Sequence, residues 1–268
     1  MYTIQRILLT NKLKSYIIKE INYCEDKRLI RLDKFISDAV PCTRKEATGY
    51  IRSGRISVDG KTVKAGDTKI DEKSSVVAFD GKEFSYSKYI YIMLNKPEGL
   101  ISATEDIREK TVMSLLPESY MTKGLFPAGR LDKDTTGLLI LTNDGETAHR
   151  LLSPKYNKKK VYKVTAEKPF CSSDIEKLKK GVMLDDGKTK PAELEITENP
   201  HIAYMTLTEG RFHEVKRICL ALDNLCVELE RVRFAEIPLD KTLERGQWRL
   251  LTQEETSLLL SVKDDKLK

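Results

Sequence analysis

An aspartate at the edge of an apolar run is the first residue in this sequence whose surroundings suggest chemistry. Asp132 lies in PAGRLDKDTTGLLILTNDG, residues 127–145, where a loop of glycine and charged residues leads into the run Gly137 to Thr142. The run predicts a strand, and a loop at a strand end can hold a reactive side chain fixed and exposed. Such a carboxylate could act as nucleophile or general base. Alternatively, Asp132 and Asp134 could simply accept backbone N–H groups in a turn.

Metal-dependent chemistry is a further possibility for this segment. Asp132, Asp134 and Asp144 together could hold two Mg²⁺ ions, as in a nuclease. The other ligand types argue against it, because the three histidines lie far apart and the five cysteines form no C-x-x-C pair. We therefore expect no metal. The odd cysteine count also fits a reducing cytoplasm better than a disulfide framework.

Length and charge limit the classes of protein to which this chain could belong. The chain has 268 residues, which favours two domains. Lys and Arg total 47 against 41 Asp and Glu, a net charge of +6, so local basic faces and a polyanionic partner are plausible. The first thirty residues contain no secretory apolar core. Nothing downstream approaches the roughly 18 uninterrupted apolar residues of a membrane span, so we expect a soluble protein without a membrane partner.

A small basic module is predicted for residues 30–79, after an extension covering 1–29. Thr43 and Glu46 have capping-box spacing at the start of a helix that ends at Gly54. The dipeptide Asp59-Gly60 then predicts a tight hairpin turn. Its basic side chains, which could contact a polyanion, are Arg31, Lys34, Arg44, Lys45, Arg52 and Arg55. Judged by charge alone, these residues could equally form an ordinary solvent-exposed helix face without a partner.

A larger domain is predicted for residues 89–262, after a polar linker at 80–88. Short strands alternate with helices without a repeating βαβ period, which indicates an α+β fold with a mainly antiparallel sheet. The predicted strands are 89–94, 137–142, 161–165, 192–197, 203–208 and 226–233, and the predicted helices are 147–152, 173–180, 213–222 and 252–260.

Two resemblances give these elements a function. Residues 31 to about 77, including GRISVDGKTV, resemble the S4 RNA-binding domain, which implies that the six cations of this module contact RNA. GRLDKDTTGLLILTNDG is very similar to the central motif of pseudouridine synthases of the small-ribosomal-subunit group and their large-subunit relatives. LNKPEGLIS from Leu94, KKKVYKV from Lys158 and LTEGRFHEVKRIC from Leu207 follow in the order that the family requires. The resemblance covers roughly residues 31–255.

The resemblance implies roles for individual residues. Asp132 matches the catalytic aspartate, and Tyr162 matches the tyrosine that lies against the target base. Lys216 matches the basic residue that pairs with the carboxylate, and Arg130 matches an arginine that helps to hold the RNA backbone. Leu250, after GQW, is expected to line the pocket. Glu214 departs from the family, whose members commonly carry Gln there.

The activity implied is isomerisation of uridine to pseudouridine in ribosomal RNA, with 16S RNA favoured over 23S RNA. The reaction involves no net redox change or group addition, so no cofactor is expected. The expected partner is ribosomal RNA or an assembling small subunit, and we expect a cytoplasmic monomer. The alternative from another class is a non-enzymatic ribosome-binding or assembly factor, in which Asp132 only caps a turn.

Overall fold

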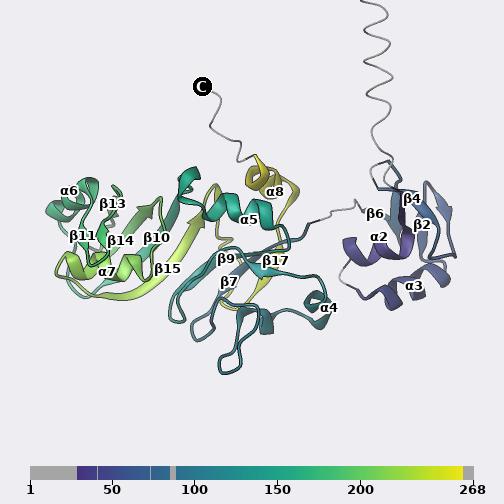
Figure 1. Ribbon diagram of the computed structural model, residues 1–268, viewed down its shortest axis with the longest axis horizontal. Coiled ribbons are helices and arrows are strands. Elements are labelled where there is room, and N and C mark those ends of the chain that lie inside the picture. Colours follow the sequence, from purple (N-terminus) through teal and green to yellow (C-terminus); the bar gives the residue numbers. More distant parts are fainter. Residues whose placement is uncertain (1–28, 41, 73, 85–88, 262–268) are drawn as a thin grey trace, which may run out of the picture. The chain divides into compact units, whose positions relative to one another are not determined.

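The computed structural model describes residues 29–40, 42–72, 74–84 and 89–261. The chain divides into two compact units, one before and one after the boundary between residues 88 and 89 (Figure 1). The predicted extension 1–29 lies outside the described residues except for Leu29. None of the described helices is long and apolar enough to cross a bilayer.

The first unit packs two helices against two small sheets. Strands β1 (Leu29–Arg31) and β4 (Lys69–Asp71) form an antiparallel pair, and β3 (Lys61–Thr62), β2 (Ile56–Val58), β5 (Val77–Phe79) and β6 (Lys82–Phe84) form a four-stranded sheet in that order. Helices α2 (Leu32–Ala39) and α3 (Arg44–Arg52) lie together on the core (Figure 1). The apolar side chains of one helix face and the strands' inner faces are thus buried together.

Local signals predicted two features of this unit correctly. The Thr43 side chain accepts the Glu46 N–H while the Glu46 carboxylate accepts the Thr43 N–H, so the capping box is complete. Asp59 and Gly60 both adopt positive φ, 48° and 77°, between β2 and β3. A two-residue turn of this kind matches the twist of the strands that it joins.

The segment expected to be a linker contributes a strand to the first unit. Residues 82–84 form β6, which pairs with β5 through a turn at Asp80 and Gly81, where φ is again positive. The Asp80 carboxylate also forms an ion pair with Arg55. A second Asp-Gly turn therefore closes a hairpin inside this polar sequence, and residues 85–88 lie outside the described part of the chain.

The second unit is built on a nine-stranded sheet. Its main path runs β13 (Glu193–Ile196), β14 (Ile202–Leu207), β10 (Lys160–Ala166), β15 (Cys226–Phe234), β9 (Thr136–Thr142), β7 (Tyr91–Lys96) and β17 (Trp248–Leu250). Strand β16 (Ile237–Pro238) pairs with β15, and β8 (Phe126–Pro127) pairs with β9. All of these pairings are antiparallel except that of β9 with β15, which confirms the predicted α+β class with a mainly antiparallel sheet.

Helices cover the sheet in three apolar cores. Helices α5 (Gly145–Leu152) and α8 (Gln253–Leu260) pack on one face of β7 and β9, and the turn η1 (Val112–Leu115) with α4 (Glu118–Met121) packs on the other (Figure 1). Helices α6 (Ser172–Lys180) and α7 (Glu214–Ala221) cover the β13–β14–β10–β15 half. The turn η2 (Pro154–Tyr156) and the hairpin β11–β12 (Met183–Leu184, Gly187–Lys188) complete the unit.

A glycine permits the parallel pairing at the centre of this sheet. Gly137 has φ +99°, and a Cβ atom built there would lie 2.4 Å from the carbonyl oxygen of Arg231. Any side chain would therefore push β9 and β15 apart. Because β9 begins directly after the loop that carries Asp132, this close approach also fixes where that loop lies against the β10–β15 half.

Candidate functional site

The loop before β9 is held by a buried lysine. Lys96, at the end of β7, is fully buried, and its ammonium group donates to the carbonyl oxygens of Asp132 at 3.0 Å and Thr135 at 2.8 Å. It also reaches the carbonyls of Pro97 and Lys133. Burial lowers the pKa of Lys96 to about 8. The backbone of the loop is thus fixed without using its carboxylates.

Ser102 fixes the residue before Asp132 from the same segment of chain. Its hydroxyl donates to the Leu131 carbonyl at 2.9 Å and accepts the Leu131 N–H at 3.0 Å. Leu131 itself is buried in the core below. The sequence LNKPEGLIS, which carries both Lys96 and Ser102, therefore serves to position the Asp132 loop.

The carboxylate of Asp132 faces a cation from a distant helix. The Lys216 ammonium on α7 lies 3.4 Å from Asp132 Oδ2, and it hydrogen-bonds both oxygens of Asp134 at 2.5 and 2.7 Å. Burial lowers the pKa of Lys216, but the hydrogen bond to Asp134 and the two carboxylate charges outweigh burial and raise it. The same hydrogen bond lowers the pKa of Asp134. One cation is shared between the two carboxylates.

His213 completes the ring of polar groups around Asp132. Its Nε2 atom lies 3.5 Å from Asp132 Oδ1, and its backbone is left-handed with φ 46°. Its ring stacks on Phe212, with centroids 3.7 Å apart and planes 20° apart. A non-glycine residue in this conformation costs free energy, and here it directs the imidazole at the carboxylate.

These groups line an open pocket of about 420 Å³. The Asp132 side chain is 27% exposed at its edge, so the carboxylate is reachable from solvent although its backbone is fixed. This volume is in the range of small-ligand sites. The lining residues are Glu98, Gly99, Asp132, Lys133, Asp134, His213 and Lys216.

Tyr162 lies on β10 and does not line this pocket. It is the cross-strand neighbour of Arg231 on β15, and it packs against two of the apolar cores. Burial raises the pKa of Tyr162, while the positive charge of Arg231 opposes the rise and the charges of Glu214 and Asp132 add to it. The phenol therefore stays neutral and lies within electrostatic reach of Asp132.

Arg231 is a buried cation that the sequence did not single out. It is 1% exposed, its Nε donates to the Leu138 carbonyl at 2.8 Å, and its guanidinium lies 4.6 Å from the centre of the Phe234 ring. Its Nη2 atom has no hydrogen-bond partner among the described residues. The Arg231 side chain thus links β15 to β9, and the residue is the cross-strand neighbour of Tyr162 on β10.

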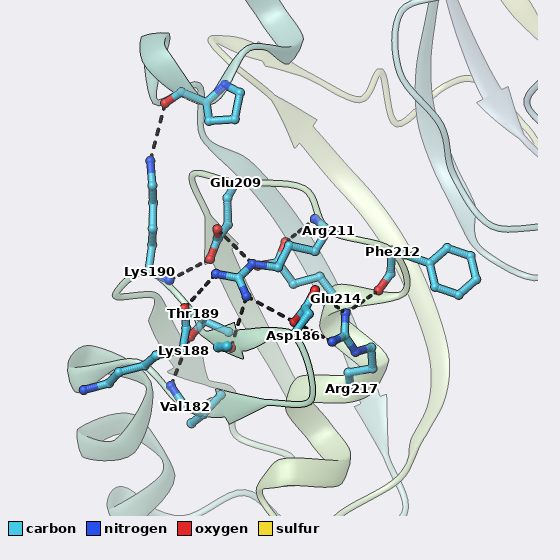
Figure 2. Close-up of polar contacts among 12 residues, drawn as sticks. Val182, Asp186, Lys188, Thr189, Lys190, Glu209, Arg211, Phe212, Glu214 and Arg217 are labelled. Atoms are coloured by element: carbon cyan, nitrogen blue, oxygen red, sulfur yellow. Dashed lines mark hydrogen bonds and ion pairs between the residues drawn. The ribbon is translucent and has the colours of Figure 1, made fainter.

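Glu214 occupies a buried acidic pair at the start of α7. It is 5% exposed, one oxygen accepts the Arg211 N–H at 3.0 Å, and the other has no partner within the described residues. Burial and the nearby Glu209 carboxylate raise the pKa of Glu214 to about 7. Glu209 in turn accepts the Lys190 N–H and the Arg211 side chain (Figure 2). The Glu214 carboxyl is therefore only about half ionised near pH 7.

Two of the expected site residues lie elsewhere or make no contact in the site. Arg130 is exposed and has no ion-pair or hydrogen-bond partner in the described part of the chain. Leu250 is 48% exposed on β17 and pairs with Ile92. Since Lys96 marks the end of β7 nearest the Asp132 loop, Leu250 lies four positions away along that strand and does not line the pocket.

The cations expected to bind RNA in the first unit are all exposed, but three are already paired. Arg31 donates twice to the buried Asp33 carboxylate, and Arg44 lies 3.5 Å from it. Arg55 pairs with Asp80 and lies over the Phe79 ring at 4.4 Å. Lys34, Lys45 and Arg52 are exposed as well. A basic surface on α2, α3 and the following turn results.

Comparison with known proteins agrees with this fold. Residues 90–221 match the family described as RNA pseudouridylate synthase, and residues 30–75 match the S4 domain. An uncharacterized RNA pseudouridine synthase of Bacillus subtilis, YtzG, is 43% identical over 234 residues, covering 86% of this chain and 98% of that protein.

Named relatives and a solved structure extend this match. The ribosomal small subunit pseudouridine synthase A of Vibrio cholerae is 41% identical, over 85% of this chain and 98% of that protein, and the one of Escherichia coli is 42% identical, over 84% and 98%. A crystal structure of a pseudouridylate synthase, 38% identical, superimposes with a TM-score of 0.61 over 86% of this chain and 99% of that one. The chain belongs to the RNA pseudouridine synthase family.

Proposed function

We propose that this protein isomerises uridine to pseudouridine in the RNA of the small ribosomal subunit, 16S RNA, with Asp132 as the catalytic carboxylate. The observation that carries the proposal is the Asp132 side chain, anchored through its backbone by Lys96 and open to a pocket beside Lys216. The small-subunit target is supported by relatives at 41–43% identity that are named for it.

The chemistry requires breaking the bond between the ribose C1′ and the uracil N1, turning the base and joining C1′ to C5. The C5 proton is lost and N1 gains one, so the atoms balance without a co-reactant. Asp132 either attacks C1′ or removes the C2′ proton, and both routes require an ionised carboxylate. Lys216, between Asp132 and Asp134, places a positive charge beside the reacting carboxylate.

The remaining site residues would bind the unstacked nucleotide. A target base must leave its stack at a cost of a few kcal/mol, and Tyr162 stacking on the uracil would recover roughly 1–3 kcal/mol. Arg130, exposed and without a partner in the described residues, remains available to a phosphate. Both roles rest on the motif positions of these residues.

The first unit would provide affinity without reading sequence. Its exposed cations can contact phosphates of a folded RNA. We propose that 30–79 is the RNA-anchoring domain and that the enzyme acts as a monomer in the cytoplasm, on free 16S RNA or on an assembling subunit.

The nuclease alternative is disfavoured by where the carboxylates lie. Asp144 caps α5, accepting the N–H groups of Glu146 and Thr147, and it accepts the Tyr91 hydroxyl at 2.6 Å. Asp132 and Asp144 flank opposite ends of β9, whose seven residues span roughly 20 Å. The three carboxylates cannot share a pair of ions at that separation.

The direct test is a product assay on a 16S RNA transcript and on 16S RNA in small-subunit particles, with 23S RNA as the comparison. Pseudouridine mapped at one site in 16S RNA, formed equally in chelator and without RNA cleavage, supports the proposal. Modification confined to 23S RNA would overturn the target, and RNA binding without any product would favour an assembly factor.

A further inference from the structure

Hydrogen bonds and ion pairs join the segment between β14 and α7, residues 208–213, to the turn between β11 and β12. The Arg211 guanidinium donates to Glu209, Asp186 and the carbonyls of Gly187 and Lys188, at 2.7–3.2 Å (Figure 2). These contacts come from both sides of the loop. The backbone around residue 212 is therefore fixed before any substrate arrives.

A second arginine holds Phe212 itself. Arg217 donates to the Phe212 carbonyl at 3.0 Å while its guanidinium also binds the carboxylates of Asp185 and Asp186. The Phe212 side chain points away from this network (Figure 2) and is 75% exposed. A fixed main chain thus presents an apolar ring to solvent.

Single exposed apolar residues are common and need no explanation alone. Phe212 differs because one face of its ring is stacked on His213, whose Nε2 lies 3.5 Å from Asp132 Oδ1. The left-handed backbone at His213 costs free energy as well. Phe212 and His213 therefore combine an exposed aromatic ring, a left-handed backbone and a contact to the carboxylate of Asp132.

We propose that the stacked Phe212–His213 pair is a platform on which a base of the RNA next to the target uridine stacks. This inference rests on the proposed function. Aromatic faces bind unstacked RNA bases whatever their identity. The target ribose must lie at Asp132, on the His213 side, so the outer face of Phe212, one ring further away, receives a neighbouring base.

The first experiment compares Phe212→Ala with Phe212→Trp and with Leu220→Ala, a control that truncates a 59%-exposed side chain on α7 away from the pocket. Binding and single-turnover pseudouridine formation are measured on an RNA hairpin that contains the target. Phe212→Ala should weaken binding about 5- to 150-fold, the range for one base–aromatic stack, while Phe212→Trp and Leu220→Ala stay within twofold of wild type. Equal binding by Phe212→Ala and wild type would overturn the platform.

A second experiment identifies the contact and separates it from folding. RNAs with one abasic site, placed in turn at each nucleotide flanking the target, are tested against wild type and Phe212→Ala. One position should weaken binding by wild type but cause no further loss in the variant, which a double-mutant cycle reports as coupling. Additive losses at every position would refute the stack.

Failure of the platform and failure of the proposed function remain distinguishable. If wild type forms pseudouridine and Phe212→Ala binds and reacts equally well, only the platform is refuted. If wild type binds the hairpin with the expected coupling but forms no pseudouridine in any ribosomal RNA, the platform stands and the activity assignment is refuted.

Discussion

Lys96 holds Asp132 by its main chain, with the ammonium group 3.0 Å from the carbonyl oxygen and no carboxylate within its hydrogen bonds. The main chain of the loop therefore binds the lysine, and its carboxylates are not needed for this. Backbone carbonyls satisfy the buried lysine, so the Asp132 side chain is left to face Lys216 and the pocket. Burying a charged lysine that has only carbonyl partners costs free energy. Removing the lysine also costs free energy, because the buried carbonyls then lose their hydrogen bonds.

Lys96→Met should therefore disrupt the site more than the fold. We expect a loss of about 2–4 kcal/mol in the free energy of unfolding, because carbonyls of the loop lose their partner. The rate of pseudouridine formation should fall at least tenfold while RNA affinity is kept. Lys179→Met is the control, since that lysine lies on α6 and makes only an exposed pair with Glu176. A variant of Lys96 with wild-type rate would show that the loop needs no such anchor.

Gly137→Ala tests the close approach of β9 and β15. The added Cβ would lie 2.4 Å from the Arg231 carbonyl oxygen at a φ of +99°, so we expect destabilisation of about 3 kcal/mol or more. Gly145→Ala is the matched control, because nothing lies within 4 Å of its Cβ at the start of α5. Denaturant unfolding of both variants measures the difference. Similar stability of the two would mean that the strands can separate freely.

Glu214→Gln should change how stability depends on pH. The folded pKa of Glu214 is raised from 4.5 to about 7, so the folded chain binds this proton more tightly than the unfolded chain. Stability is therefore lost as the pH rises from about 4.5 to 7. The neutral amide removes this loss, and the variant should be about 1–3 kcal/mol more stable than wild type at pH 8 but similar to it at pH 4.5.

Glu193→Gln is the control for that experiment, because Glu193 is exposed and only pairs with Lys159 at the surface. Its stability difference from wild type should be small at every pH. Thermal unfolding between pH 4.5 and 8 follows both variants. A constant difference between Glu214→Gln and wild type across this range would contradict the raised pKa.

Replacing cations on α3 should reduce the salt dependence of RNA binding. The slope of log affinity against log salt changes by roughly 0.7–0.9 for each phosphate contact. Exchange of Arg44, Lys45 and Arg52 for Gln is expected to flatten it by about 2 while the catalytic rate at saturating RNA is kept. The same exchange at Lys177, Lys179 and Lys180 on α6 provides the control. Loss of slope in the α6 variant alone would place the anchor elsewhere.

Features set by neighbouring residues were predictable from the sequence. The capping box at Thr43 and the turn at Asp59 each depend on residues within three positions, and both are present. The predicted strands and helices of the second unit also occur, with ends shifted by up to two residues. Strand β6 was not predicted, because it is short and lies in a polar segment, and its pairing with β5 depends on the Asp80-Gly81 turn.

Contacts between distant segments were not predictable from local pattern. Lys96 is the polar end of an apolar run, and three of its four carbonyl partners lie 36 to 39 residues away. Arg231 reads as one charge in an alternating strand, yet it is buried against Leu138. The Asp132–Lys216 pair was expected only through the family resemblance, since nothing in the spacing of the two residues indicates contact.

The proposal that Asp132 carries the reaction is tested most directly by Asp132→Asn in a single-turnover assay of pseudouridine in 16S RNA, with binding measured in parallel. Asp106→Asn, at an exposed loop carboxyl of the same unit, is the control. We expect the rate of Asp132→Asn to fall at least about a hundredfold with RNA affinity within a few-fold of wild type. An Asp132→Asn protein that forms pseudouridine as fast as the control would contradict the mechanism.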